Sequence, residues 1–245
     1  MTMYNSGLRC GLLAAFLFLG APASLTAATI SGVVRFHGDI PETGTVRMVG
    51  DSFCTACHTS PPPKQDLLVN ASGEVQNVVV YIKDGLPPAT VNSPPSTPVE
   101  LRQEGCIFYP RVFGIRTGQE LRITNRDNTM LNMVAAPKSN SRFIKFIKNS
   151  SGAPETAKFE KPEVPVLLKS DVHPWMASYA GVFNHPYFAV TDGQGRFELR
   201  DVPTGMYTLS TWHEKLGVRE VRLQVADMET TTVQFRYGSR PVEDQ

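Results

Sequence analysis

The chain has 245 residues, of which 41% are hydrophobic and 19% are charged, and its formal net charge is +1. This length and hydrophobic content are typical of a globular protein with one large core or two modest ones, and they exclude a disordered chain. A net charge this close to zero gives no electrostatic reason to bind a polyanion, so nucleic acid is not an expected partner.

The N-terminus has the three regions of a secretory signal. Arg9 precedes the apolar run 11–19, and small residues follow through Ala28. The apolar run is too short to span a bilayer as a helix, so we expect residues 1–28 to be a cleaved signal peptide, with no membrane span left after cleavage. The expected location is the periplasm or the extracellular medium, where disulfides persist.

Most of the remaining chain alternates apolar and polar residues over short stretches that end in turn signals. Five prolines between Pro87 and Pro98 indicate a linker, and the polar, basic segment 137–162 indicates a solvated loop with a few anchoring aromatic residues. Without a convincing amphipathic helix, the pattern predicts an all-β protein. The predicted strands are 29–36, 76–83, 105–115, 120–125, 164–168, 187–190, 196–199, 206–212, 219–225 and 231–235.

Three cysteines remain after the expected cleavage: Cys54, Cys57 and Cys106. The number is odd, and connectivity does not follow from sequence. The string Cys-Thr-Ala-Cys-His at 54–58 matches the attachment pattern of c-type haem, with two thioether bonds and His58 as the proximal ligand. However, no helix-forming sequence flanks the string, and haem would leave Cys106 unpaired.

The segment 169–176, Lys-Ser-Asp-Val-His-Pro-Trp-Met, has features of the metal-binding loop of a copper protein. His173 and Met176 lie three residues apart in a turn that contains Pro174. Imidazole and thioether are ligands of blue-copper sites, but such sites also need a thiolate. Ser170 stands at the position where a cysteine would complete a short loop.

Several strings along the chain together resemble a group of exported bacterial cupredoxin-like proteins, often called methylamine-utilisation-like. The resemblance rests on Gly105-Cys106 with Tyr109-Pro110, Asn132, the loop 169–176, the string 185–191 and Trp212-His213-Glu214. The C-terminal strings 192–197 and 203–207 also resemble carboxypeptidase regulatory-like domains, which are small transthyretin-type sandwiches grouped with carbohydrate-binding-like folds.

The resemblance implies two combined β-sandwiches. Residues 29–95 and 186–240 would supply the two parts of a regulatory-like sandwich, and residues 96–185 a cupredoxin-like Greek-key sandwich inserted between them. A simple tandem is the alternative arrangement. The resemblance also implies that the host is a bacterium.

The chain departs from the family pattern at two ligand positions. The pattern places a histidine just before the Asn of a polar turn and a cysteine just after the Lys of the metal loop, where this chain has Leu131 and Ser170. Only His173 and Met176 are left as copper ligands. A type 1 copper centre, and electron transfer through it, are therefore not expected.

The family pattern further implies a disulfide between Cys54 and Cys106, while a pairing through Cys57 stays open.

The loop 169–176 then has two interpretations. In one, His173 and Met176 plug the end of the sandwich. In the other, they combine with His185 or His213, which fall near turns, in a looser site for cuprous copper or zinc.

The expected function is a non-catalytic exported binding module with an unidentified exported partner and no cofactor. No paired carboxylates, Gly-x-Ser-x-Gly string or phosphate-binding loop indicates an enzyme. One alternative is an electron carrier with c-type haem on Cys54, Cys57 and His58. The other is a carbohydrate-binding accessory protein that binds polysaccharide. The aromatic residues available for sugar stacking, although core packing is their expected use, are Tyr179, Phe183, Tyr187 and Trp212.

Overall fold

The computed structural model describes Met1 and residues 28–90 and 93–238. Over these residues the chain forms sixteen strands, one five-residue α-helix and one short 3-10 helix, η1 (Pro88–Thr90), so the predicted all-β class is confirmed. The predicted signal peptide, 1–28, lies almost wholly outside the described residues. Among the helices that are described, none has the length and apolar character needed to cross a membrane.

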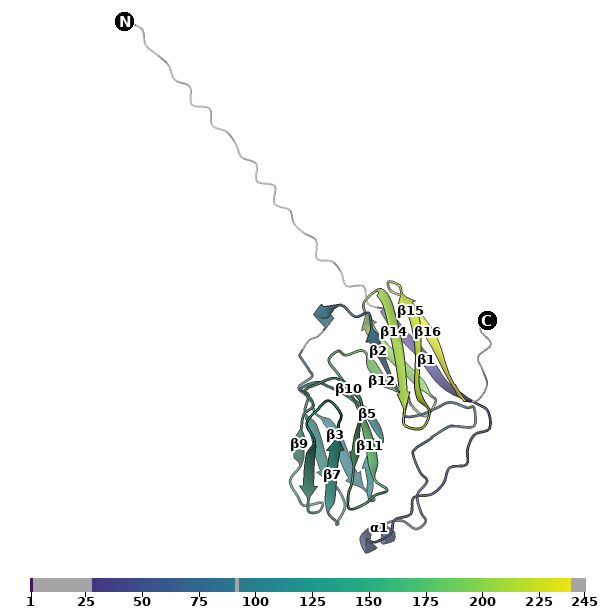
Figure 1. The fold of residues 1–245 in the computed structure, drawn as a ribbon, viewed down its shortest axis with the longest axis vertical. Coiled ribbons are helices and arrows are strands. Elements are labelled where there is room, and N and C mark those ends of the chain that lie inside the picture. The colour runs from purple at the N-terminus through teal and green to yellow at the C-terminus, as the bar shows by residue number, and fades with distance from the viewer. Residues whose placement is uncertain (2–27, 91–92, 239–245) are drawn as a thin grey trace.

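Strands from both ends of the chain form one β-sandwich, which we call the terminal sandwich (Figure 1). In its three-stranded sheet, β1 pairs antiparallel with β13 and parallel with β16. Its core contains Ile30 and Phe235 from this sheet and Val80 and Leu209 from the other. In spatial order, the two sheets contain β13 (Arg196–Val202), β1 (Ala28–His37) and β16 (Thr230–Gly238), and β12 (Phe188–Val190), β2 (Val79–Asp84), β14 (Gly205–His213) and β15 (Gly217–Val225).

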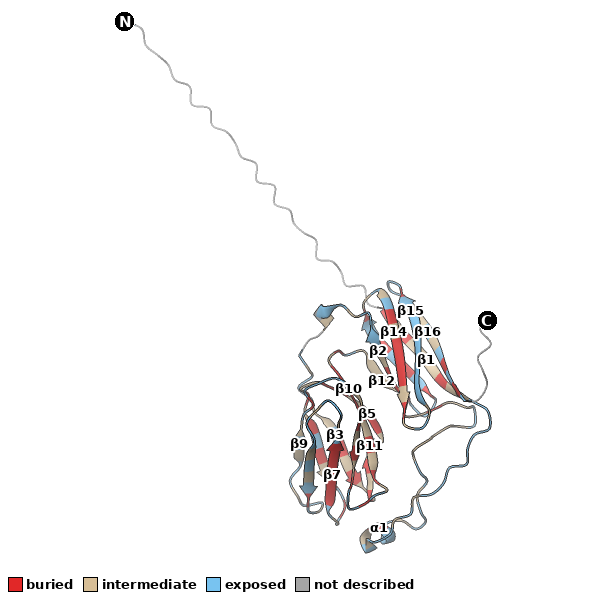
Figure 2. Cartoon of the chain, viewed as in Figure 1, coloured by how far each residue is buried: buried red, intermediate tan, exposed pale blue. Residues whose placement is uncertain are grey.

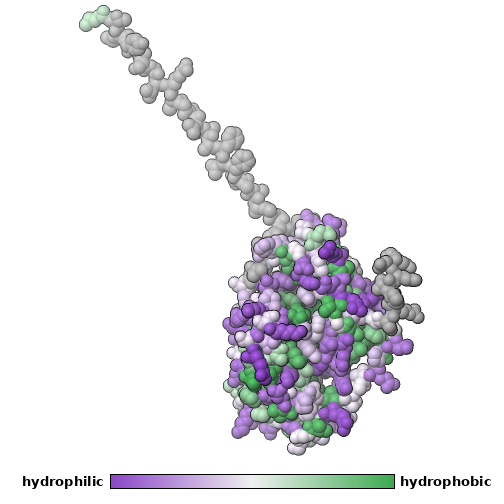
Figure 3. Space-filling model, in the orientation of Figure 1, coloured by the Kyte–Doolittle hydropathy of each residue, from purple (hydrophilic) through white to green (hydrophobic). Residues whose placement is uncertain are grey.

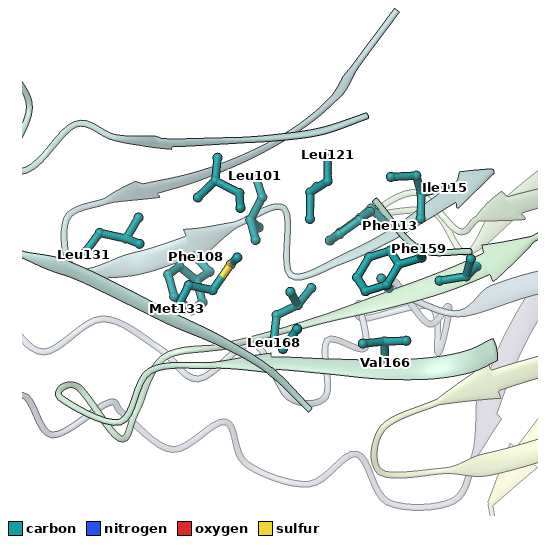
Figure 4. Packing of buried hydrophobic residues seen from close by; sticks show 14 of the residues in the cluster. Leu101, Phe108, Phe113, Ile115, Leu121, Leu131, Met133, Phe159, Val166 and Leu168 are labelled. Carbon is teal, nitrogen blue, oxygen red and sulfur yellow. The ribbon is translucent and has the colours of Figure 1, made fainter. Parts of the chain in front are cut away.

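The middle of the chain forms a second β-sandwich, the central sandwich. Its core side chains come from both sheets and fill the space between them, as Figure 4 shows for Phe108, Met133 and Leu168. The first sheet contains β5 (Val112–Arg116), β11 (Ala177–Phe183), β10 (Glu163–Lys169), β7 (Leu131–Ala136) and β8 (Phe143–Ile147). The second contains β4 (Ile107–Tyr109), β3 (Val99–Glu104), β6 (Leu121–Asn125) and β9 (Glu155–Ala157).

The prediction of a solvated loop at 137–162 is wrong for two segments, which form β8 and β9. β8 is an edge strand that pairs with β7, and β9 pairs with β6. Lys145 in β8 forms an ion pair with Glu155 in β9. Polar and basic residues surround the short apolar run of β8, and they hid the strand pattern in the sequence.

The two sandwiches lie side by side and share a small apolar cluster (Figure 1). Phe183 of the central sandwich stacks on Phe188 of the terminal sandwich, with ring centroids 4.4 Å apart. Tyr179 packs against Trp212 across the interface in a tilted arrangement, with ring centroids 5.1 Å apart. These rings, together with the partly buried Tyr187, therefore pack inside or against the protein rather than forming a row for sugar stacking.

A partly buried ion pair accompanies these rings. Arg111 donates to both carboxylate oxygens of Glu214, at 2.7 and 2.6 Å, and to the carbonyl of Ala177 at 3.0 Å. Its guanidinium also lies over the ring of Tyr179. The bidentate geometry makes this a strong charge-assisted contact between the sandwiches.

A long connection, residues 38–78, joins β1 to β2 and carries the helix α1 (Ser52–Ala56). Figure 1 shows α1 beyond the end of the central sandwich, far from the strands that the connection joins. Asp51 is the N-cap of this helix, and its side chain accepts a hydrogen bond from the N–H of Cys54.

The buried residues are distributed as this arrangement of strands predicts. Figure 2 shows buried residues concentrated on inner strands such as β7 and β14, while β15 at a sheet edge is mostly exposed. On the face shown in Figure 3, hydrophilic and hydrophobic residues are interspersed.

Candidate functional site

The loop 169–176 connects β10 to β11 at the end of the central sandwich reached by α1. Two backbone hydrogen bonds close it, from Ser170 N to Met176 O at 3.3 Å and from Met176 N to His173 O at 2.9 Å. The hydroxyl of Ser170 accepts from the N–H groups of Val172 and His173, at 3.2 and 2.9 Å. Ser170 therefore holds the turn in shape, as serine side chains do in tight turns.

His173 is 2% exposed and faces α1. Its Nε2 lies 3.0 Å from Oδ2 of Asp51 and 3.7 Å from Sγ of Cys54. Its ring packs against Trp175, with centroids 5.1 Å apart. Among the described residues, nothing hydrogen-bonds to its buried Nδ1. The ring is therefore held by its Nε2 contact and by packing.

Asp51 is the residue that joins the helix to the loop. One carboxylate oxygen accepts from Cys54 N at 3.1 Å, and the other accepts from Thr129 Oγ1 at 2.8 Å and contacts His173. Partial burial raises the pKa of Asp51, but the hydrogen bonds from Cys54, Thr129 and His173 outweigh it and lower the pKa to about 2. The carboxylate is therefore ionised at neutral pH.

A disulfide ties the same helix to the turn between β3 and β4. Cys54 is bonded to Cys106, so the predicted pairing is confirmed. The carboxylate of Asp127 accepts from the N–H groups of Gly105 and Cys106, at 2.7 and 2.8 Å, and the indole of Trp175 donates to the carbonyl of Cys106 at 2.9 Å. The helix, this turn and the loop 169–176 thus form one connected unit.

The haem string does not fit covalent haem in this arrangement. The sulfur of Cys54 is bonded to Cys106 and is not free for a thioether. Cys57 is exposed and has no disulfide partner among the described residues. A ring nitrogen of His58 lies 2.7 Å from the carbonyl of Gly105, a contact in which it must donate.

The donor set of the loop does not fit a type 1 copper centre. Leu131 is fully buried and lies at one end of the row of core side chains in Figure 4. Ser170 offers a hydroxyl that is already used by two N–H groups. His173 and Met176 are buried at the same end, but an imidazole and a thioether alone lack the thiolate and second imidazole of such a centre.

His185 does not lie near His173. The loop 169–176 precedes β11 and His185 follows it, so the seven-residue strand separates them by roughly 20 Å at 3.3 Å per residue. The ring nitrogen Nδ1 of His185 accepts from Tyr187 N at 3.2 Å. Burial, with a smaller effect of the Arg116 charge, lowers the pKa of His185 to about 4. The ring is therefore a neutral, structural group.

His213 has a similar role at the end of β14. Its Nδ1 accepts from the N–H groups of Lys215 and Leu216, at 3.2 and 3.3 Å. Burial, and then the charge of Arg111, lowers its pKa to about 4. Over the described part of the chain, the only group of three His, Cys, Asp or Glu side chains with ligand atoms within 4.8 Å of one another is Asp51, Cys54 and His173. The predicted combination of His173 and Met176 with His185 is wrong, because β11 separates His185 from the loop, while the alternative with His213 stays a prediction.

Asp51 and Thr129 belong to this site but were not among the residues predicted from the sequence. Asp51 precedes Cys54 by three residues, a spacing at which an Asp caps a helix, and that signal was available. Thr129 is recognised only from the fold, because its hydroxyl reaches a residue 78 positions away.

No protein-family model matches this sequence, and no curated protein is similar enough to count as a relative. Several solved structures match part of it. A copper-containing nitrite reductase from Thermus scotoductus is 24% identical, with a TM-score of 0.31, and the match covers 36% of this chain and 22% of that chain.

A purple cupredoxin from Nitrosopumilus maritimus is 16% identical, with a TM-score of 0.29, over 34% of this chain and 97% of that chain. An oxidised amicyanin mutant is 12% identical, with a TM-score of 0.32, over 42% of this chain and 97% of that chain. At these values the likenesses say nothing about what this chain binds.

Proposed function

We propose that this protein is an exported, non-catalytic binding module, related to cupredoxins, in which α1 closes the loop end of the central sandwich. The observation that carries the proposal is the double attachment of α1, by the disulfide of Cys54 with Cys106 and by the contact of Asp51 with His173. Because His173 is buried and contacts Asp51, its side chain stabilises the fold and is poorly placed to exchange electrons with a partner protein.

Export is supported by the disulfide and by the signal-like residues 1–28. Disulfides persist in oxidising compartments and are rare in the cytosol of most organisms. The pair Cys54 and Cys106 links segments 52 residues apart and holds the long connection on the central sandwich. In the proposed role the disulfide is structural.

Binding is proposed at the exposed apolar side chains around the same end, which we call the loop-end surface: Met130, Ile144, Phe146 and Val172. Their exposures are 40%, 44%, 57% and 48%. Phe146 lies opposite Asn132 in the sheet, and the amide oxygen of Asn132 accepts from Asp171 N at 2.8 Å, next to Val172. Apolar side chains gathered on a surface mark interaction sites, and aromatic residues dominate binding energy at interfaces.

The partner that this surface suits is another exported protein. Ile144 and Phe146 project from β8, which lies at the edge of its sheet among the described strands. An edge strand has unpaired backbone groups as well as side chains, so it binds an extended segment of another chain readily. Polysaccharide binding has no comparable support, because the rings expected to stack on sugars pack at the interface between the sandwiches.

Photo-crosslinking tests this assignment. A photoreactive phenylalanine analogue at position 146 is compared with the same analogue at Val218, which is 47% exposed on β15 of the terminal sandwich. Irradiation in the periplasm of the native host should give an adduct of one defined mass at position 146 and none at 218. When the photoreactive analogue is placed at position 144 instead, adding the substitution Phe146→Glu should remove the adduct. Equal labelling at both positions, or none at 146, contradicts the proposal.

A further inference from the structure

β8 turns one row of side chains toward the core and the other toward solvent. Its pairing with β7 places Phe143, Lys145 and Ile147 opposite core residues of β7, so these three side chains lie on the inner face of the sheet. Because side chains alternate along a strand, Ile144 and Phe146 lie on the outer face, where they are 44% and 57% exposed. The outer row of β8 is therefore apolar and open to solvent.

A basic residue stands at each end of this outer row. Arg142 comes one residue before β8 and Lys148 one residue after it, and both are exposed. The period of two places them in step with Ile144 and Phe146. Neither forms an ion pair with any residue that the structure describes. The row thus has the order basic, apolar, aromatic, basic.

The carboxylates near β8 are engaged by other groups. Glu155 pairs with Lys145 at 3.0 Å, and Asp171 pairs with Lys169 at 2.8 Å. Glu163 accepts from the N–H groups of residues 138–140. Over residues 137–163 the sequence has six basic and three acidic side chains, a net charge of +3 in a chain whose net charge is +1. This charge favours an acidic partner, because complementary charge gives specificity and speeds association.

We propose that an extended acidic segment of the partner adds to β8 as a further strand, an inference that rests on the proposed function. Side chains directly opposite each other on neighbouring strands lie about 4.5 to 5.5 Å apart. The added strand therefore places carboxylates opposite Arg142 and Lys148, and apolar side chains opposite Ile144 and Phe146. Its pattern over seven residues is acidic-x-apolar-x-apolar-x-acidic. Backbone hydrogen bonds to the open edge of β8 give affinity, and the outer row gives specificity.

Lys145 restricts which strands can add to this edge. Its side chain lies on the inner face of the edge strand and pairs with Glu155 of β9. An apolar side chain at the middle x of the pattern would lie beside this ion pair and remove water from it. Charges that point inward on an edge strand discourage unspecific pairing in this way. The middle x is therefore polar, and uniformly apolar strands are rejected.

Two fluorescent peptides test the proposal on the oxidised protein. One has the sequence Glu-Thr-Val-Thr-Val-Thr-Glu, and its control has Lys in place of each Glu. Fluorescence anisotropy should show binding of the Glu peptide that weakens as salt is added. The Lys peptide should bind at least about tenfold more weakly, because like charges directly opposite each other destabilise a strand pair. Equal affinity of the two peptides overturns the proposal.

Two methylated forms of the Glu peptide test strand addition itself. Only one edge of an added strand faces β8, so N-methyl groups on every second residue should abolish binding in one of the two possible settings and spare it in the other. Unchanged binding of both methylated forms would show that the backbone is not used and would overturn the added strand.

Charge reversal on the protein tests the basic residues. Arg142→Glu/Lys148→Glu should lose about tenfold or more in affinity for the Glu peptide and gain affinity for the Lys peptide. The matched control is Arg222→Glu/Arg236→Glu, which makes the same change of charge at exposed positions of β15 and β16. It should bind the Glu peptide like the wild type. Equal losses in the two variants would show a response to net charge alone and overturn the proposal.

Photo-crosslinking at position 146 separates this inference from the proposed function. An adduct that forms in the wild type and with unchanged yield in Arg142→Glu/Lys148→Glu would leave the loop-end surface in place and overturn the acidic strand. No adduct in the wild type would overturn the surface and the inference together. Co-sedimentation with phosphatidylglycerol vesicles, without binding of the Glu peptide, would assign the basic residues to a membrane surface and also overturn the proposal.

Discussion

The Nε2 of His173 lies 3.0 Å from Oδ2 of Asp51, although the two residues are 122 positions apart in the sequence. Asp51 belongs to the connection between two strands of the terminal sandwich, and His173 belongs to a loop of the central sandwich. The contact therefore makes the stability of the connection depend on the fold of the central sandwich.

Asp51→Asn isolates this contact from helix capping. Asn caps helices about as well as Asp, so the variant keeps the bond to Cys54 N and loses the charge that attracts His173 and Thr129. We expect it to lower the free energy of unfolding by about 1 to 2 kcal/mol. Asp51→Ala should cost about 1 kcal/mol more, because it also removes the cap. Denaturant unfolding measures both, and equal stability of Asp51→Asn and the wild type contradicts the role of the carboxylate.

The double variant Cys54→Ala/Cys106→Ala should be less stable by about 2 to 4 kcal/mol, because the disulfide closes a loop with a sequence separation of 52 and so restricts the unfolded chain. Cys57→Ser, which removes the exposed thiol, is the matched control and should unfold like the wild type. Non-reducing mass analysis of the wild type should find one disulfide and one alkylatable thiol, at Cys57. Alkylation at Cys54 or Cys106 without reduction would refute this.

The ion pair of Arg111 with Glu214 should be important for the interface between the sandwiches. Glu214→Gln leaves the partly buried guanidinium without its charged partner, so we expect a loss of about 2 kcal/mol, below the range for fully buried pairs. The double variant Arg111→Met/Glu214→Leu should recover most of that loss, because it leaves no unpaired buried charge. A double-mutant cycle with the single variants Arg111→Met and Glu214→Leu, followed by thermal and denaturant unfolding, gives the coupling, and additive effects would show that the two side chains act independently.

Acid should destabilise the protein through its buried histidines. The pKa values of His185 and His213 fall to about 4 in the folded state, against an ordinary value of 6.5. The unfolded chain therefore binds protons that the folded chain does not, and stability present above pH 6.5 is lost as the pH falls toward 4. Each histidine contributes about 3 kcal/mol to this loss. Asp51 acts at lower pH, between its ordinary pKa of 3.8 and about 2.

His185→Asn and His213→Asn test the assignment, because the amide oxygen of Asn can replace Nδ1 as acceptor but does not titrate in this range. Each variant should flatten the decline in stability between pH 6.5 and 4. An unchanged decline in the double variant would mean that other groups cause it.

Ser170→Cys alone should not create a blue-copper centre. It supplies a thiolate next to His173 and Met176, but Leu131 still leaves the second imidazole missing, and the hydroxyl that fixes the turn is lost. We expect an intense visible band with Cu²⁺ only when Leu131→His is added. Absorption spectra of both variants decide this, and a strong band in the single variant would contradict it.

The all-β fold could be predicted because alternating apolar residues set the strand pattern locally, as in β1 and β2. The disulfide between Cys54 and Cys106 followed from a family pattern, since connectivity itself does not follow from spacing. β8 was missed because a short edge strand with basic residues looks like a solvated loop. The contact of Asp51 with Thr129 and His173 was missed because it depends on where a 41-residue connection, 38–78, folds back on the central sandwich.

The predicted combination of His173 and Met176 with His185 failed for a similar reason. His185 follows a strand and lies near a turn, which sequence can show. Which end of the sandwich each turn reaches depends on strand direction and pairing, and β11 places His185 at the opposite end from His173.

In the proposed function, the loop end is a closed, structural unit without a redox centre. The most direct measurement is the visible absorption spectrum and metal content of the protein purified from the periplasm of a host that matures c-type haem. We predict no Soret band after denaturation, no intense visible copper band and an intact disulfide between Cys54 and Cys106. A Soret band that survives denaturation, or one bound copper with an intense visible band, would contradict the account.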